Sequence, residues 1–132
     1  MTKTCKKVTV DGTDCRIYAP FDRKWFSFKF KAAGVRYEVA VCIKTGDIVW
    51  INGPFPCGRF PDITIFRRDL IHKLRAGEMV EADLGYRGEP TKIRTPDAYV
   101  SLQDKRAKKR VRARHETVNA RLKDFDVLTK VF

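Results

Sequence analysis

Three acidic residues occupy positions from which their carboxylates could meet. Asp11 follows the β-branched run Val8-Thr9-Val10, and Asp83 follows the short apolar segment 79–82. Glu116 lies near the end of the chain in a strongly basic segment that we predict to be helical. Carboxylates at the carboxyl ends of buried strands are where open α/β sheets place their chemistry. Carboxylates converging from two strands and a helix would hold a divalent metal, and the basic surroundings would hold nucleic acid.

The position of Asp11 has two interpretations. Asp11-Gly12 stands between two apolar runs, and this pair is a strong signal for a β-hairpin turn. In the other interpretation, Asp11 stays within or at the end of a first central strand and points at a ligand. Asp14 is then a second acidic candidate close by.

The remaining elements must position these acids. Segments 37–43 and 48–51 predict a hairpin around the turn Thr45-Gly46-Asp47. A helix is expected from Asp62, as N-cap, to Gly77, because Ile63, Phe66, Leu70 and Leu74 recur at helical spacing. Short strands at 79–82 and 91–93 and a long helix over about 101–124 follow. The order predicts a mixed sheet in which the strand from Met79 runs parallel to the strand ending at Asp11.

Segment 20–31 interleaves aromatic and basic side chains. Such a mixture suits stacking on nucleic acid bases. However, Phe26, Phe28 and Phe30 are spaced two apart, which favours a strand with these three rings on one buried face. Lys29 and Lys31 would then face solvent, where a DNA backbone could meet them.

Composition limits the function classes. The chain has 132 residues, which suits one domain, and 28 Lys and Arg against 16 Asp and Glu give a net charge of +12. This charge indicates a polyanion binder, whereas no apolar run approaches the ~20 residues of a membrane span. The start of the chain does not resemble a signal peptide. The four cysteines have no zinc-ligand spacing, so we expect reduced thiols in an intracellular protein.

Basic residues cluster in the predicted last helix. Taken alone, a charge run of this kind can also be a solvated helix face. As candidates for phosphate contacts we name Lys105, Arg106, Lys108, Lys109, Arg110, Arg112 and Lys123.

Four stretches of the chain resemble the DDE superfamily of transposase endonucleases, specifically the Harbinger-type group and its bacterial insertion-sequence relatives. They are Val10-Asp11-Gly12-Thr13, the segment 58–66 (GRFPDITIF), the segment 82–86 (ADLGY) and the segment 114–123 (RHETVNARLK). Each is short, but all four occur in the family's order and together span nearly the whole chain.

The resemblance implies an α/β fold, a ribonuclease H-like mixed sheet flanked by helices, formed by residues 1–132 as a single catalytic domain. It implies Asp11 on strand one, Asp83 after strand four and Glu116 on a late helix as the catalytic and metal-binding acids. Asp62 is the alternative second acid, since family sequences also carry an acid there. We prefer Asp83, because a helix N-cap already explains Asp62. The cofactor would be Mg²⁺ or Mn²⁺, with two ions about 4 Å apart.

By resemblance, the reaction is hydrolysis of a DNA phosphodiester at a transposon end, followed by strand transfer into a target. The helix-turn-helix DNA reader that usually precedes such domains is missing, so we expect a fragment or a truncated copy. A separate DNA-binding protein or self-association would then help to position DNA. We expect a nuclear protein in a eukaryote, otherwise a cytoplasmic one. The alternative is a catalytically inactive, domesticated or decayed module that only binds nucleic acid, and a ribonuclease H-like nuclease unrelated to transposition is a further alternative.

Overall fold

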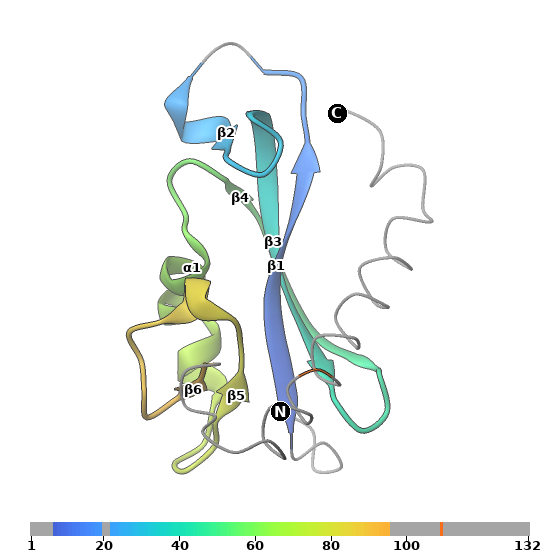
Figure 1. Cartoon of the computed structure of the whole chain (residues 1–132), viewed down its shortest axis with the longest axis vertical. Helices are drawn as coiled ribbons and strands as arrows, with labels where there is room; N and C mark the ends of the chain where they lie inside the picture. Colours follow the sequence, from blue (N-terminus) through green and yellow to red (C-terminus); the bar gives the residue numbers. More distant parts are fainter. Residues whose placement is uncertain (1–6, 20–21, 96–108, 110–132) are drawn as a thin grey trace.

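The computed structural model describes residues 7–19, 22–95 and 109 (Figure 1). Glu116 and the predicted helix over 101–124 lie outside these ranges, except for Lys109, which is exposed at a helical position. The other basic residues proposed to contact phosphates also lie outside them. The described part is a mixed α/β structure with a dominant sheet and few helices.

A mixed sheet forms the centre of the fold. Its strands are β1 (Val8–Arg16), β2 (Phe26–Ser27), β3 (Ala32–Cys42), β4 (Ile48–Pro56), β5 (Val80–Glu81) and β6 (Ile93–Arg94). Strand β3 pairs antiparallel with β1, β2 and β4. Strand β5 pairs parallel with β1, and β6 pairs parallel with β5. The predicted hairpin and the predicted parallel strand are therefore both confirmed.

Strand β1 passes through Asp11 and Gly12 without turning. Asp11 pairs with Val39 and Gly12 pairs with Glu38 in an antiparallel ladder that continues to Arg16. The hairpin interpretation of Asp11-Gly12 is therefore wrong. The local turn signal is overridden because both sides of the Asp-Gly pair find partners along the same neighbouring strand.

The helical segment after the sheet's third long strand is shorter than predicted. Helix α1 spans Asp62–Arg68, and a 3₁₀ segment, η2 (Leu70–Lys73), continues it. The two are separated at Asp69, whose carboxylate accepts a 2.6 Å hydrogen bond from the Asn52 amide of β4. This tertiary contact holds the break, while Leu70 remains fully buried. None of the described helices is long and apolar enough to cross a bilayer.

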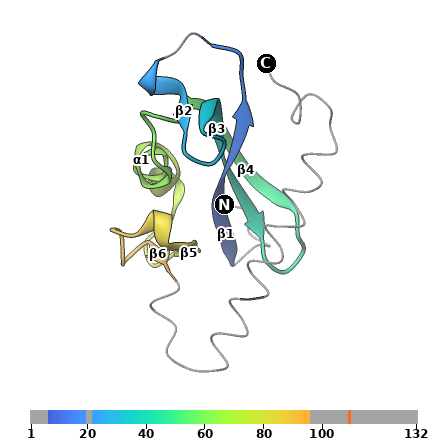
Figure 2. The same ribbon diagram turned by 45° about the horizontal axis from the view of Figure 1, so that its top comes forward.

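One face of the sheet forms the main core. Helix α1 lies on one side of the crossed strands β1 and β3, as do β5 and β6 (Figures 1 and 2). The buried members of this core are Val8, Val10, Ala40, Cys42, Phe66, Leu70, Val80, Tyr86 and Ile93. The Tyr86 ring meets Phe66 of α1 edge to face, with centroids 6.3 Å apart. This packing holds α1 and the segment after β5 against the first residues of β1.

The three alternating phenylalanines do not lie in one long strand. A 3₁₀ turn, η1 (Arg23–Trp25), precedes β2, which has only two residues. The chain then turns, and the Lys31 amide donates a 2.7 Å hydrogen bond to the Ser27 carbonyl. The turn breaks the alternation of the side chains, so Phe28 is 84% exposed. The prediction of three buried rings in one strand is therefore wrong, because Phe28 is exposed and Phe26 and Phe30 are only partly buried.

The cysteines differ in state. Cys15 and Cys57 are buried free thiols, as expected. Burial raises the pKa of the Cys57 thiol to about 12, so it stays protonated and unreactive. Cys42 is disulfide-bonded, and the prediction of a reduced thiol is wrong at this position.

Candidate functional site

Asp11 occupies the middle of β1, half-buried at the edge of the core. Its Oδ1 accepts a 2.9 Å hydrogen bond from the Gly12 amide. Burial raises the pKa of Asp11 to about 7, and the nearby negative charges of Asp83 and Asp62 add to this effect. The Gly12 amide and Lys29 act in the opposite direction. Asp11 is therefore within electrostatic reach of the other two carboxylates.

Asp83 lies beside Asp11 because of the parallel pairing of their strands. Val8 pairs with Val80 and Thr9 with Glu81, so continuing this register by two residues brings Asp11 level with Asp83. The Asp83 Oδ1 accepts a 3.0 Å hydrogen bond from the Gly85 amide, and the residue is exposed. A short strand followed at once by a turn thus leaves this carboxylate facing solvent next to β1.

Asp62 is the first residue of α1, and it is not the N-cap. Pro61 occupies the cap position and no side chain caps the helix, so our reason for ranking Asp62 behind Asp83 as a site acid was wrong. Its Oδ1 is buried without a hydrogen-bond partner and lies 3.5 Å from the Arg36 Nε. Burial raises the pKa of Asp62 to about 6, although the Arg36 charge opposes the shift. A buried carboxylate oxygen with an unused lone pair suits a cation.

Two glycines allow the three carboxylates to gather. A Cβ on Gly12 would overlap Asp62 Oδ1 and would lie 3.1 Å from Asp62 Cγ. A Cβ on Gly85 would lie 3.2 Å from Asp83 Oδ1 and 3.4 Å from Asp62 Oδ2. Asp62 therefore fills the space above Gly12 and reaches the turn that holds Asp83. We call Asp11, Asp62 and Asp83 the acidic cluster.

Asp14, the other acidic candidate of β1, is already engaged. Its two carboxylate oxygens accept hydrogen bonds from Arg36 Nε and Nη2, at 2.7 and 3.0 Å. Burial alone would raise the pKa of Asp14, but the hydrogen bonds from Arg36 and Ser27 outweigh it and lower the pKa. Arg36 also donates to the Phe60 carbonyl. Asp14 therefore orients Arg36, which in turn faces Asp62.

Two further buried polar side chains, Tyr86 and Glu38, lie near the cluster, and neither is among the site residues predicted from the sequence. Tyr86 and Glu38 are fully buried, and neither the Tyr86 hydroxyl nor Glu38 Oε2 has a hydrogen-bond partner. Burial raises the pKa of Tyr86, and the charges of Asp62, Glu38 and Asp11 raise it further. The pairing of Glu38 with Gly12 places it across from the cluster. Nothing in the local pattern distinguishes these residues from ordinary strand and core positions.

The donor set suits a hard divalent cation, although the acids are not arranged as a finished metal centre. Within residues 7–19 and 22–95, no group of three His, Cys, Asp or Glu side chains is close enough to hold a metal ion. Nevertheless, Asp11 and Asp62 are half-buried acids whose negative charges repel each other and Asp83. Carboxylate oxygens are the ligands that Mg²⁺ prefers, and a cation would relieve this repulsion. Glu116, the third predicted acid, lies outside the described residues.

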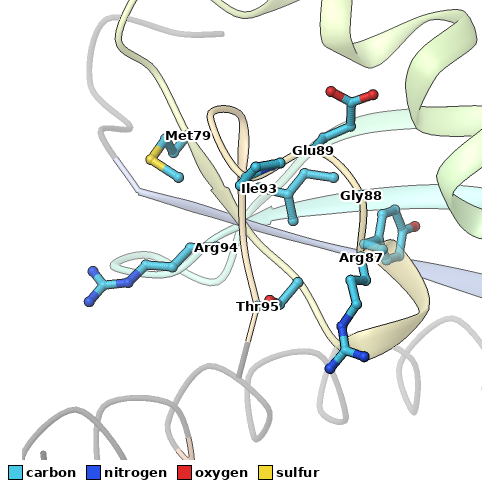
Figure 3. Close-up of a pocket in the computed structure, with 9 residues that line it drawn as sticks. Met79, Arg87, Gly88, Glu89, Ile93, Arg94 and Thr95 are labelled. Carbon is cyan, nitrogen blue, oxygen red and sulfur yellow. The ribbon is translucent and has the colours of Figure 1, made fainter. Parts of the chain in front are cut away.

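A cavity of about 430 Å³ is lined by residues of the loop after η3 (Leu84–Tyr86) and of β6. Arg87 and Arg94 extend on either side of Thr95 at its edge (Figure 3). Met79 and Ile93 supply apolar walls. The two arginines give the edge of this cavity a positive charge.

Comparison with known proteins gave no relatives. No family model matches the chain, and no match was found among the curated proteins or the solved structures.

Proposed function

We propose that the chain is a metal-dependent endonuclease of the DDE type, which hydrolyses phosphodiester bonds in DNA. The observation that carries the proposal is the acidic cluster. Three carboxylates, from β1, from the start of α1 and from the segment after β5, lie within electrostatic reach of one another in a chain of net charge +12. An acidic centre in a basic protein fits a substrate that is a polyanion and a cofactor that is a cation.

The strand order supports the ribonuclease H-like fold that the sequence resemblance implies. Apart from the two-residue β2, the sheet has three antiparallel strands, β4, β3 and β1, followed by β5 and β6 parallel to β1. In chain order the five strands are β1, β3, β4, β5 and β6. Asp11 therefore lies on the first of them, and Asp83 follows the fourth. These are the positions that the resemblance implies for the first two acids.

The residues divide the work as follows. Asp11, Asp62 and Asp83, together with Glu116, would hold Mg²⁺ or Mn²⁺. When bound, a pair of such ions activates an attacking water and stabilises the departing oxygen of the scissile bond. Arg36 is a positioning residue, because its bidentate contact with Asp14 fixes the guanidinium that faces Asp62. Strand transfer at transposon ends, and a nuclear location in a eukaryote, follow from the resemblance.

The second candidate is a domain that binds nucleic acid without cutting it. The observation that favours it is the lack, in the described ranges, of three acids close enough to form a finished metal centre. The net charge of +12 serves this function equally well.

Nicking of supercoiled plasmid DNA separates the two candidates. We expect the wild-type chain to nick in the presence of Mg²⁺ or Mn²⁺ and not in EDTA. Asp11→Asn and Glu116→Gln should abolish nicking, because each removes a negative charge that a hard cation needs. The matched control is Asp47→Asn, which makes the same change at an exposed turn between β3 and β4.

Three outcomes decide the matter. Loss of nicking in Asp11→Asn with normal nicking in Asp47→Asn supports the endonuclease. A folded wild-type chain that binds DNA but never nicks it supports the binding domain. Equal nicking by wild type and Asp11→Asn would mean that the activity does not use the acidic cluster.

A further inference from the structure

A second cavity, of about 440 Å³, lies beside β2 and is lined by Arg23, Phe26, Phe28 and Gly58. We call these four residues the Phe28 surface. Phe28 is 84% exposed, and its ring stands edge to face against Phe26, with centroids 5.1 Å apart. An exposed ring that is held by a second ring offers a flat apolar face to a ligand.

The floor of this cavity is fixed by close backbone packing. The Gly58 amide donates a 2.9 Å hydrogen bond to the Lys24 carbonyl. A Cβ on Gly58 would overlap the Arg23 carbonyl oxygen, so only glycine permits this approach. The 3₁₀ turn η1 and the loop after β4 are thereby joined, and the cavity between them is a built feature of the fold.

Hydrogen bonds connect the Phe28 surface to the acidic cluster. Ser27 precedes Phe28 and donates a 2.8 Å hydrogen bond from its hydroxyl to Asp14. Asp14 in turn holds Arg36, whose Nε lies 3.5 Å from Asp62. A short chain of polar contacts therefore fixes the turn that presents Phe28 relative to the acids.

Electrostatic interactions also link the turn that carries Phe28 to the acidic cluster. Lys29 follows Phe28 in the turn, is exposed, and acts to lower the pKa values of both Asp11 and Asp62. It therefore lies within electrostatic reach of the acidic cluster. Lys31 is exposed in the same turn, and Arg23 lines the cavity. A ligand that bridges the two places must offer an aromatic face to Phe28 and negative charge to these cations.

We propose that the Phe28 surface stacks an unpaired base of a nucleic acid strand, next to a phosphate that Lys29 guides toward the acidic cluster. The proposal deepens the function proposed above and rests on its nucleic acid substrate. In an intact duplex the faces of the bases are covered by their neighbours, so only a single strand, a flap or a frayed end can supply the base. The Phe28 surface thus makes the protein selective for unpaired nucleotides near the cut.

The test measures binding of the full chain, in EDTA, to a short fluorescein-labelled single-stranded oligodeoxynucleotide and to the duplex of the same sequence. Phe28→Ala and Phe28→Leu should each weaken single-strand binding about 5- to 150-fold, the range equivalent to ~1–3 kcal/mol per stacked base. Phe28→Leu keeps apolar bulk without a π face, and Phe28→Trp should preserve binding. Duplex binding should change by less than about twofold, as for a neutral surface substitution.

Tyr18→Ala is the matched control, because Tyr18 is 83% exposed but does not line the cavity. It should bind the single strand as the wild type does. Single-strand affinity that survives Phe28→Ala or Phe28→Leu would overturn the proposal, as would an equal loss on the duplex or in Tyr18→Ala. A urea unfolding curve for each variant confirms that the fold is kept.

The same data separate this proposal from the endonuclease itself. EDTA prevents metal-dependent cutting, so the binding result does not depend on activity. Phe28-dependent single-strand binding without any nicking would refute only the endonuclease. If the chain nicks DNA but its single-strand affinity does not depend on Phe28, only the proposal that Phe28 stacks on a base is refuted.

Discussion

Gly12→Ala should disturb the acidic cluster more than any other single added methyl group. The new Cβ would overlap Asp62 Oδ1, and it would lie 3.1 Å from Asp62 Cγ and 3.2 Å from Arg36 Cδ. Gly12 lies in an extended strand without a left-handed backbone conformation, so alanine itself fits the backbone. The cost is therefore steric and arises from Asp62.

The expected magnitude follows from two opposing effects. Forcing an extra methyl group into a packed site costs about 1–3 kcal/mol. Replacing glycine by alanine within a regular element stabilises the fold by about 0.5–1 kcal/mol. We therefore expect Gly12→Ala to lower the free energy of unfolding by up to about 2.5 kcal/mol. In an Asp62→Ala background the overlap disappears, and the same substitution should become stabilising by about 0.5–1 kcal/mol.

Urea unfolding of the four members of this double-mutant cycle, in EDTA at constant pH, measures the change of sign. Gly34→Ala is the additivity control. Its Cβ would meet the Cys15 carbonyl oxygen at 3.2 Å, and its three nearest atoms belong to Cys15, Ser27 and Cys57, so its effect should be the same in both backgrounds. If Gly12→Ala costs as much in the Asp62→Ala background as in the wild type, then Asp62 does not occupy the space above Gly12. Our description of the cluster would then be wrong.

Two further predictions concern the polar groups around the cluster. Burial raises the pKa of Glu38 from 4.5 to about 7. Between these pH values the folded chain therefore holds a proton that the unfolded chain has released. The free energy of unfolding should fall by up to ~3 kcal/mol from pH 4.5 to 7 and then level off. Glu38→Gln can still accept the hydrogen bond from Trp50 Nε1 but has no proton to release, so its stability should not show this part of the fall. If urea unfolding at pH 5 and 8 shows the same loss of stability in the wild type and in Glu38→Gln, the raised pKa of Glu38 is wrong. Arg36→Met should destabilise the fold by about 3–5 kcal/mol, because it leaves the Asp14 carboxylate, 4% exposed, without its cation. Adding Asp14→Leu should recover most of that loss in thermal unfolding, and no recovery would mean that Arg36 acts through other contacts.

The sequence predicted the elements that carry the acids, since these depend on local patterns. The β-branched run before Asp11, the hairpin formed by β3 and β4, and the short strand before Asp83 all have the expected type. The parallel pairing of β1 with β5 was also predictable, because a helix between two strands favours a crossover connection. These predictions bring Asp11 and Asp83 to adjacent strands without any knowledge of tertiary contacts.

Other features follow from contacts between residues far apart in the chain, which local patterns do not encode. Asp62 has the local signature of an N-cap, but Pro61 takes the cap and the missing side chain of Gly12 draws Asp62 into the cluster. Asp14 matches Asp11 as a strand acid, yet Arg36 from the neighbouring strand neutralises it. Phe28 follows the spacing of buried strand residues, but a turn exposes it.

Local propensity and periodicity thus indicated strands β1, β3, β4 and β5 and the start of helix α1, and the excess of Lys and Arg gives the chain its net charge of +12. The tertiary structure alone decided that Asp62 lies near Asp11 and Asp83 and that Asp14 is neutralised by an arginine. The physical reason is that the ionisation and contacts of an acid depend on burial and on charges within a few ångströms. The neighbours of Asp62 that supply these, Gly12 and Arg36, come from strands β1 and β3, far from it in the sequence.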